Sequence, residues 1–177
     1  FHMALKCKAI KNEEQRIGQI ISRLLEDKNV ALVSDAGTPA ISDPGFKLIR
    51  ELRDRNIPVI SIQGPSAVIA ALSISGLPTD KFVFLGFLPK AQNQRKELLK
   101  TYGRLDATLT IYESPFRVTR LLVEIQDVLG DRKVVLAKDL TKMFEDVQQG
   151  KVSEFLKTPE KIKEKGEYVV LVAKEGY

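Results

Sequence analysis

Two short segments of small and polar residues each follow an apolar run, and both carry groups suited to holding a ligand. The first, residues 34–39, has the sequence SDAGTP, and the second, residues 64–66, has the sequence GPS. Asp35 offers a carboxylate to hydroxyl or amino groups, and Gly37 lets a ligand approach the main chain closely. The structural alternative for the first segment is a tight strand-to-helix turn in which Asp35 acts as a cap.

A third cluster, YESPFR at residues 112–117, combines a carboxylate, a capping serine and a forked cation. In the functional interpretation, Glu113 lies at the lip of a cleft and Arg117 reaches a phosphate. In the structural interpretation, the segment caps a helix and Glu113 pairs with Arg117 four residues later. The residues alone leave both interpretations open.

A fourth cluster, AKDLTK at residues 137–142, supplies two ammonium groups, a carboxylate and a hydroxyl. Lys138, Asp139 and Lys142 have the chemistry to act as a base or to stabilise an alkoxide. The alternative is a solvated face of the protein. A basic segment precedes these clusters, because residues 81–104 hold six Lys or Arg against one Glu. Such a segment either follows a phosphate backbone or forms an ordinary exposed helix.

Several other chemistries lack the residues that they need. The chain has one histidine and one cysteine, His2 and Cys7. It therefore has few of the residues that a Ser-His-Asp or Cys-His catalytic arrangement, or a metal site built from cysteines, would need. We expect no metal. Glycine-rich dinucleotide, Walker A and His-Glu-x-x-His motifs are absent from the sequence. A net charge of +5 fits an RNA or phosphate partner, or simply a lysine-rich soluble protein.

The remaining bulk properties are those of a globular protein. Of the 177 residues, 44% are hydrophobic and 29% are charged, which is enough for a real core. No apolar run is long enough for a membrane span, and no signal-peptide pattern begins the chain. A single cysteine fits a reducing compartment. We therefore expect a cytoplasmic protein without a membrane partner.

The first two clusters require neighbouring parallel strands to bring them together. An apolar stripe at positions 17, 20, 21, 24 and 25, with Asn12 as its cap, predicts a first helix. The pattern then predicts a buried strand at 29–33, a helix from Pro44 with residues 46, 49 and 52 on one face, a strand at 57–62 and a helix that ends at Gly76. Alternating strands and helices form parallel βαβ units, which bind ligands beyond the carboxyl ends of their strands.

The second part of the chain reads as a mixed α/β arrangement with more strands. The expected strands are 81–87, 107–113, 132–140, an edge strand within 144–152 and a buried strand at 166–173; helices are expected at 89–104, after Ser114, and as short pieces near Ser153 and Thr158. The fold class is therefore α/β, with a parallel-sheet domain at 1–78 followed by a mixed-sheet domain at 79–177. Because the first domain starts on a helix, we expect its first strand to be missing.

Taken in order, these motifs resemble one family. The stretches ALVSDAGTPAISDPG, PVISIQGPSAVIAALSISGLPTDKFVFLGFLP, YESPFR, DLTK and GEYVVLV are similar to the tetrapyrrole methylase superfamily. Within it they resemble the branch that modifies bacterial ribosomal RNA, because SDAGTP stands where the porphyrinoid enzymes have a GGDP-like loop. The resemblance extends from Glu13 to Ala173.

The resemblance implies two α/β domains that hold S-adenosylmethionine between them, and a homodimer. It implies 2′-O-methylation of a cytidine ribose in 16S ribosomal RNA. The cofactor-binding residues that it implies are Asp35, Ala36, Gly37, Thr38, Pro39, Gly64, Pro65 and Ser66, with main-chain groups near Ala71 and Leu72. For catalysis we expect Lys142 to orient the ribose hydroxyl, Arg117 to hold an adjacent phosphate, and Glu113 to contribute its carboxylate. The alternatives are a tetrapyrrole C-methyltransferase and a non-catalytic RNA-binding fragment.

The sequence departs from the family pattern at its beginning. The family starts with an apolar strand that ends in a PIGN-like loop, followed by an EDTR-like segment, and neither occurs here. Residues 1–11 also fit the family poorly. We therefore expect a fragment that binds S-adenosylmethionine weakly or not at all and is itself inactive; micromolar binding in a calorimeter would contradict this.

Overall fold

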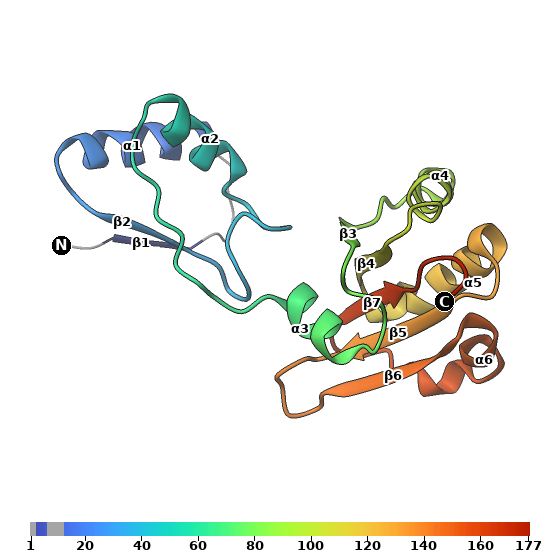
Figure 1. Ribbon diagram of the computed structural model, residues 1–177. Helices are drawn as coiled ribbons and strands as arrows, with labels where there is room; N and C mark the ends of the chain where they lie inside the picture. Colours follow the sequence, from blue (N-terminus) through green and yellow to red (C-terminus); the bar gives the residue numbers. More distant parts are fainter. Residues whose placement is uncertain (1–2, 7–12) are drawn as a thin grey trace. The chain divides into compact units, whose positions relative to one another are not determined.

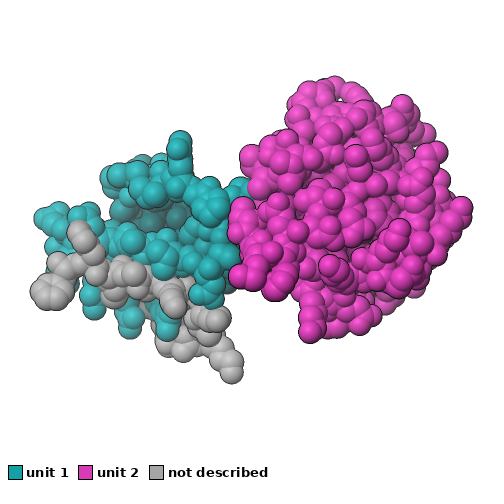
Figure 2. Space-filling model, turned by 90° about the horizontal axis from the view of Figure 1, so that it is seen from below, with its two compact units in different colours: residues 1–66 teal, residues 67–177 magenta. Residues whose placement is uncertain are grey.

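The computed structural model describes residues 3–6 and 13–177, and the chain forms two compact units, residues 1–66 and residues 67–177 (Figures 1 and 2). The expected division at 78/79 lies twelve residues later, and the helix between the two positions is assigned to the second unit. A cofactor domain at 1–78 remains a prediction.

The first unit is built on two parallel strands. Strand β1 (Met3–Lys6) pairs with β2 (Val30–Val33), and helix α1 (Glu13–Leu25) connects them. The helix-first order expected from the sequence is therefore wrong, because a strand precedes α1. The proposed cap Asn12 lies outside the described residues. Strand β2 is also partly exposed rather than buried.

Two further expectations for the first unit differ from the structure. The helix from Pro44 was expected to place residues 46, 49 and 52 on one face. Helix α2 (Phe46–Asp54) packs Leu48 and Leu52 against Ile20 and Ile21 of α1, whereas Phe46 is exposed with the Arg50 guanidinium over its ring. Residues 57–62 form no strand, and Ile60 and Ile62 are exposed. An isolated extended segment gains no ladder hydrogen bonds, and the described part of the first unit pairs β1 and β2 only with each other.

The second unit contains a five-stranded mixed sheet in the order β3-β4-β7-β5-β6. Strands β3 (Phe82–Phe87) and β4 (Thr108–Glu113) are parallel, and β7 (Tyr168–Val172) lies antiparallel between β4 and β5 (Lys133–Lys138). Strand β6 (Asp146–Lys151) closes one edge antiparallel to β5. These strands confirm the mixed sheet and the edge strand expected from the sequence.

Helices cover both faces of this sheet. Helix α3 (Ala67–Ile74) packs on one face, and the other face carries α4 (Gln92–Tyr102), α5 (Val118–Leu129) and α6 (Val152–Lys157) (Figure 1). The short helix η1 (Pro115–Arg117) precedes α5, and the short helix η2 (Pro159–Lys161) follows α6. Successive side chains of a strand point to opposite faces of the sheet. Val134 and Leu136 of β5 therefore pack toward α5, whereas Val135 and Ala137 pack toward α3.

Two neighbouring residues on α5 test this packing. Leu122 is fully buried in the larger core and Val123, the next residue, is exposed. We expect Leu122→Ala to lower the free energy of unfolding by about 2–5 kcal/mol, because it leaves a cavity. Val123→Ala is the matched control and should change it by less than about 0.5 kcal/mol. Urea unfolding measures both; equal losses would contradict the assignment of faces.

Candidate functional site

The loop after β2 is held in a compact shape by its own hydroxyl group. Ser34 Oγ donates to the carbonyl oxygens of Ala36 and Gly37 at 3.2 and 2.8 Å. Gly37 has a φ of +73°, in the left-handed region that glycine adopts without a steric penalty. Asp35, Ala36 and Gly37 are all exposed, so their main chain and the carboxylate are accessible to a ligand.

The structure brings the first two sequence clusters together. Thr38 Oγ1 donates to the Pro65 carbonyl oxygen at 3.2 Å. A Cβ atom on Gly37 would come within 3.8 Å of that same oxygen, and one on Gly64 within 3.9 Å of Thr38 Oγ1. Both glycines therefore lie where the two loops meet. Exposed main chain beside a carboxylate fits the hydroxyl and amino groups of S-adenosylmethionine.

The other expected cofactor contacts lie in the second unit. Ala71 and Leu72 are buried on α3, where they pack with Val135 and Leu171 of the sheet. Their side chains are therefore part of the core, and only their main chain is left as a possible ligand contact.

Glu113 and Arg117 form the ion pair that the structural interpretation anticipated. Glu113 Oε1 accepts hydrogen bonds from Arg117 Nε and from the Ser114 amide, both at 2.7 Å. The Glu113 side chain is 1% exposed and the Arg117 side chain 33%. The carboxylate is thus used inside the protein, at the end of β4, while part of the guanidinium remains accessible to an anion.

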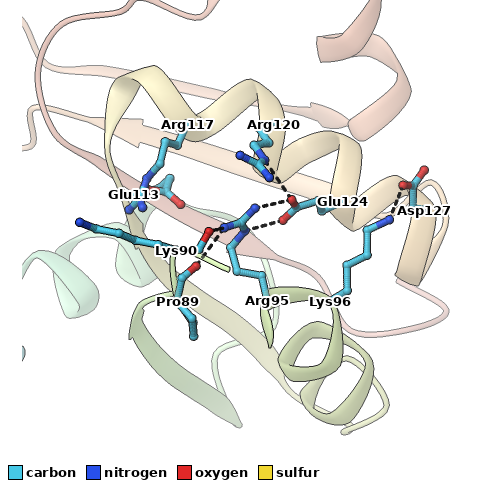
Figure 3. Close-up of polar contacts among 9 residues, drawn as sticks. All are labelled: Pro89, Lys90, Arg95, Lys96, Glu113, Arg117, Arg120, Glu124 and Asp127. Atoms are coloured by element: carbon cyan, nitrogen blue, oxygen red, sulfur yellow. Dashed lines mark hydrogen bonds and ion pairs between the residues drawn. The ribbon is translucent and has the colours of Figure 1, made fainter. Parts of the chain in front are cut away.

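A second, deeper ion pair lies beside the first (Figure 3). Arg95 Nε and Nη2 donate to the two carboxylate oxygens of Glu124 at 2.7 and 2.6 Å, and Arg95 Nη1 donates to the carbonyl oxygens of Pro89 and Lys90. The side chains of Arg95 and Glu124 are only 5% and 1% exposed. The charge of each is therefore compensated by the other, with the geometry that a buried pair requires.

This pair corrects the interpretation of residues 81–104 as a uniformly exposed basic helix. Arg95 stands three and four residues before Leu98 and Leu99, on the inward face of α4, and this spacing was the signal that sequence reasoning missed. The hydrogen bonds from Arg95 lower the pKa of Glu124 despite its burial, and Glu124 in turn raises the pKa of Arg95. Arg120 Nε adds a 3.3 Å hydrogen bond to Glu124.

The fourth cluster is a built arrangement rather than a solvated face. Lys138 is buried, and its ammonium donates to Asp139 Oδ2 and to the Phe144 carbonyl oxygen. The Lys138 hydrogen bond lowers the pKa of Asp139. Asp139 and Thr141 have φ values of +48° and +65°, which are costly for residues with a Cβ atom.

Lys142 projects from this strained loop and is exposed. Its ammonium donates to Glu167 Oε2 at 2.6 Å and lies 3.7 Å from Asp139 Oδ1. The hydrogen bond to Glu167 raises the pKa of Lys142, with Asp139 adding to the effect. Lys142 is therefore suited to act as a fixed positive charge and poorly suited to accept a proton near neutral pH.

Within residues 3–6 and 13–177, no group of three or more His, Cys, Asp or Glu side chains is placed to hold a metal ion. No helix in that part of the chain has the length and apolar character to cross a membrane.

Fold and loops together define an α/β protein with a mixed sheet and an open, glycine-containing loop after a parallel strand. A profile of the family described as Tetrapyrrole (Corrin/Porphyrin) Methylases matches residues 4–156. The chain belongs to the tetrapyrrole methylase family.

Two curated relatives have the same name. A Thermotoga maritima protein named Ribosomal RNA small subunit methyltransferase I is 43% identical over 163 residues, which are 92% of this chain and 73% of that protein. The Vibrio cholerae protein of the same name is 44% identical over 169 residues, 94% of this chain and 58% of that protein. The chain thus spans less than two thirds of the length of several of these relatives.

Solved structures agree on the fold. A conserved hypothetical protein of Aeropyrum pernix K1 superposes with a TM-score of 0.69 at 19% identity, covering 93% of this chain and 64% of that one. Uroporphyrin-III C-methyltransferase of Thermus thermophilus, complexed with S-adenyl homocysteine, gives 0.60 at 15% identity, covering 92% and 74%. At these identities the likeness concerns the fold alone.

The buried pair makes a prediction about acid stability. Arg95 holds the pKa of Glu124 below its ordinary value of 4.5, so the stabilisation is fully present above that pH and is lost as the pH falls through the lower, folded-state value. We expect Glu124→Gln to cost about 3 kcal/mol at neutral pH, because it leaves a buried guanidinium without its counter-charge.

The same variant should lose less stability than the wild type as the pH falls below the ordinary value of 4.5, since the titrating group is gone. Urea unfolding across this range measures both effects. Asp127→Asn is the control, because Asp127 lies on α5 like Glu124 and makes an exposed pair with Lys96 of α4, worth less than about 1 kcal/mol. Parallel curves for Glu124→Gln and the wild type would refute the prediction.

Proposed function

We propose that this protein is an S-adenosylmethionine-dependent methyltransferase that methylates the 2′-oxygen of a cytidine ribose in 16S ribosomal RNA. The observation that carries the proposal is the 43% identity, across 92% of the chain, to the Thermotoga maritima protein named Ribosomal RNA small subunit methyltransferase I. The SDAGTP loop, the YESPFR cluster and the DLTK cluster all lie within this similarity.

For the cofactor, the two joined loops of the first unit supply the binding groups. The main chain of residues 35–39 and 64–66 lies against S-adenosylmethionine, and the Asp35 carboxylate accepts from its hydroxyl or amino groups. Main-chain groups near Ala71 and Leu72, which the resemblance also implies, belong to helix α3 of the second unit. The bound cofactor supplies a methyl group already activated by a sulfonium, so positioning accounts for most of the acceleration.

For the substrate, the second unit supplies fixed positive charge. The Lys142 ammonium, held protonated by Glu167, stabilises the negative charge that develops on the ribose oxygen as this oxygen takes the methyl group and its proton is released to water. The exposed part of the Arg117 guanidinium holds an adjacent phosphate. Glu113 acts through Arg117, because its carboxylate is buried and already accepts the Arg117 and Ser114 hydrogen bonds.

The substrate and its setting complete the proposal. The small ribosomal subunit or its 16S RNA is the partner, the protein acts as a homodimer, and it acts in the cytoplasm. The net charge of +5 and the partly exposed Arg117 are consistent with a polyanionic substrate.

Methyl transfer from radiolabelled S-adenosylmethionine, measured with the full-length chain, tests the activity. We expect incorporation into 16S RNA of unmethylated small subunits, at a ribose whose 3′ linkage then resists alkaline cleavage. The control substrate is uroporphyrinogen III, which should receive no label. Labelling of the tetrapyrrole would instead establish the C-methyltransferase alternative, and RNA binding without transfer would establish the non-catalytic alternative.

Lys142 provides a sharper test of the proposed mechanism. We expect Lys142→Ala to lower kcat by about 10²-fold, because the charge facing the alkoxide is lost, whereas Lys142→Arg retains most of the rate. Lys157→Ala, which removes an exposed lysine at the end of α6, is the matched control and should leave kcat unchanged. Unaltered turnover in Lys142→Ala would remove this residue from the site.

A further inference from the structure

A bulge in β3 places an aromatic side chain at the carboxyl end of the parallel β3–β4 pair. The pairing runs from Phe84 opposite Thr110 directly to Gly86 opposite Ile111, so Leu85 is an extra residue in β3. Gly86 has a φ of +61°, which makes the irregularity inexpensive at this position.

The bulge changes the face on which Phe87 lies. In a regular strand, residues three apart point to opposite faces, so Phe84 and Phe87 would be separated by the sheet. With the extra residue, both rings contact Tyr112 of β4, with centroid distances of 4.9 Å for Phe84 and 5.4 Å for Phe87. Phe87 is thereby fixed on an aromatic base and is still 60% exposed.

A second exposed ring and several cations follow at the same end of the strand pair. Phe116, in the short helix directly after β4, is 74% exposed. Lys90, three residues after Phe87, is exposed, and part of the Arg117 guanidinium is accessible. Large, fixed and exposed aromatic rings beside cations are unusual on a surface that only faces water.

Several charged side chains lie close together at this edge (Figure 3). Two neighbouring clusters of ion pairs lie here, one of Arg95 and Arg120 with Glu124 and one of Arg117 with Glu113. Both carboxylates are 1% exposed, whereas two of the guanidinium groups reach the surface. The edge therefore presents positive charge outward and complements a phosphate backbone.

We propose that Phe87 and Phe116 stack on unpaired bases of a single-stranded RNA segment, while Lys90 and Arg117 bind its phosphates. Base–aromatic stacking combined with backbone cations is the usual way in which proteins hold single-stranded nucleic acid, and it tolerates many sequences. The inference rests on the proposed function and deepens it, since this surface holds nucleotides that flank the methylated ribose.

Fluorescence anisotropy with a labelled single-stranded oligoribonucleotide of the 16S sequence tests this surface. We expect Phe87→Ala to weaken binding by about 5- to 150-fold, the effect of losing one stacked base. Phe87→Trp should retain binding, and Phe87→Leu, which keeps an apolar side chain without a π face, should lose it. Phe82→Ala is the matched control, because Phe82 is 41% exposed at the opposite end of the same strand.

Salt dependence separates the two kinds of contact. Lys90→Ala should reduce the slope of log K against log salt by about one, because one phosphate contact is lost. Phe87→Ala should weaken binding at every salt concentration without changing that slope. Thermal melts of each variant confirm that the fold is retained, and the Phe87→Trp and Phe87→Leu pair keeps the test valid if the alanine variant unfolds.

Three outcomes would overturn the inference. Unchanged RNA binding in Phe87→Ala and Phe87→Leu would refute the stacking surface while leaving the proposed methyl transfer intact. Loss of self-association in Phe87→Ala, with RNA binding unchanged, would assign the surface to a second copy of the chain. A wild-type protein that neither binds RNA nor transfers methyl groups to it would refute both the inference and the proposed function.

Discussion

The second unit depends on one buried ion pair, that of Arg95 with Glu124. A guanidinium inside a protein must have its donors satisfied, and here a bidentate carboxylate and two main-chain carbonyls satisfy them. Because the carboxylate is on α5 and the guanidinium on α4, only one placement of the two helices meets this requirement. A pair of leucines at these positions would tolerate many placements, so we infer that the pair contributes specificity more than stability.

The same constraint extends to the surface. Arg95 donates hydrogen bonds to the carbonyl oxygens of Pro89 and Lys90, which lie in the turn after β3. The buried pair therefore fixes the turn that carries the exposed aromatic ring and the lysine. Glu113 plays the equivalent part at the end of β4, where it fixes Arg117 and the Ser114 amide. Buried carboxylates thus orient cations whose outer parts remain available to a ligand.

Much of this fold follows from local patterns in the sequence. The strands and helices of the second unit were predicted because their apolar residues recur with clear periods and their ends carry proline, glycine or serine. The first unit was predicted less well. Residues 57–62 have a strand's composition, but composition does not reveal whether a neighbouring strand exists to pair with. The apolar residues on α2 likewise left open whether Phe46 or Leu48 faces α1.

The site was predictable in residue type and less so in arrangement. The contact between the loops at Thr38 and Pro65 was expected from two neighbouring strand ends, but it forms although residues 57–62, which precede the second loop, make no strand. Spacing alone did not decide whether Glu113 would be a free carboxylate or a partner of Arg117. The four-residue separation of Glu113 and Arg117 is the same in either case. The bulge at Gly86 was also beyond local rules, since a glycine in an apolar strand is compatible with either regular or irregular pairing.

The order of strands in the second unit has a consequence for how the protein is made. Strand β7, whose residues are all buried, lies in the middle of the sheet although it comes last in the sequence of strands. When a nascent chain has emerged only as far as β6, the parallel β3–β4 pair and the β5–β6 hairpin have no strand to join them, and each leaves an apolar edge open. Folding of this unit during translation therefore waits for residues 168–172, and until they emerge the two half-sheets depend on protection from aggregation.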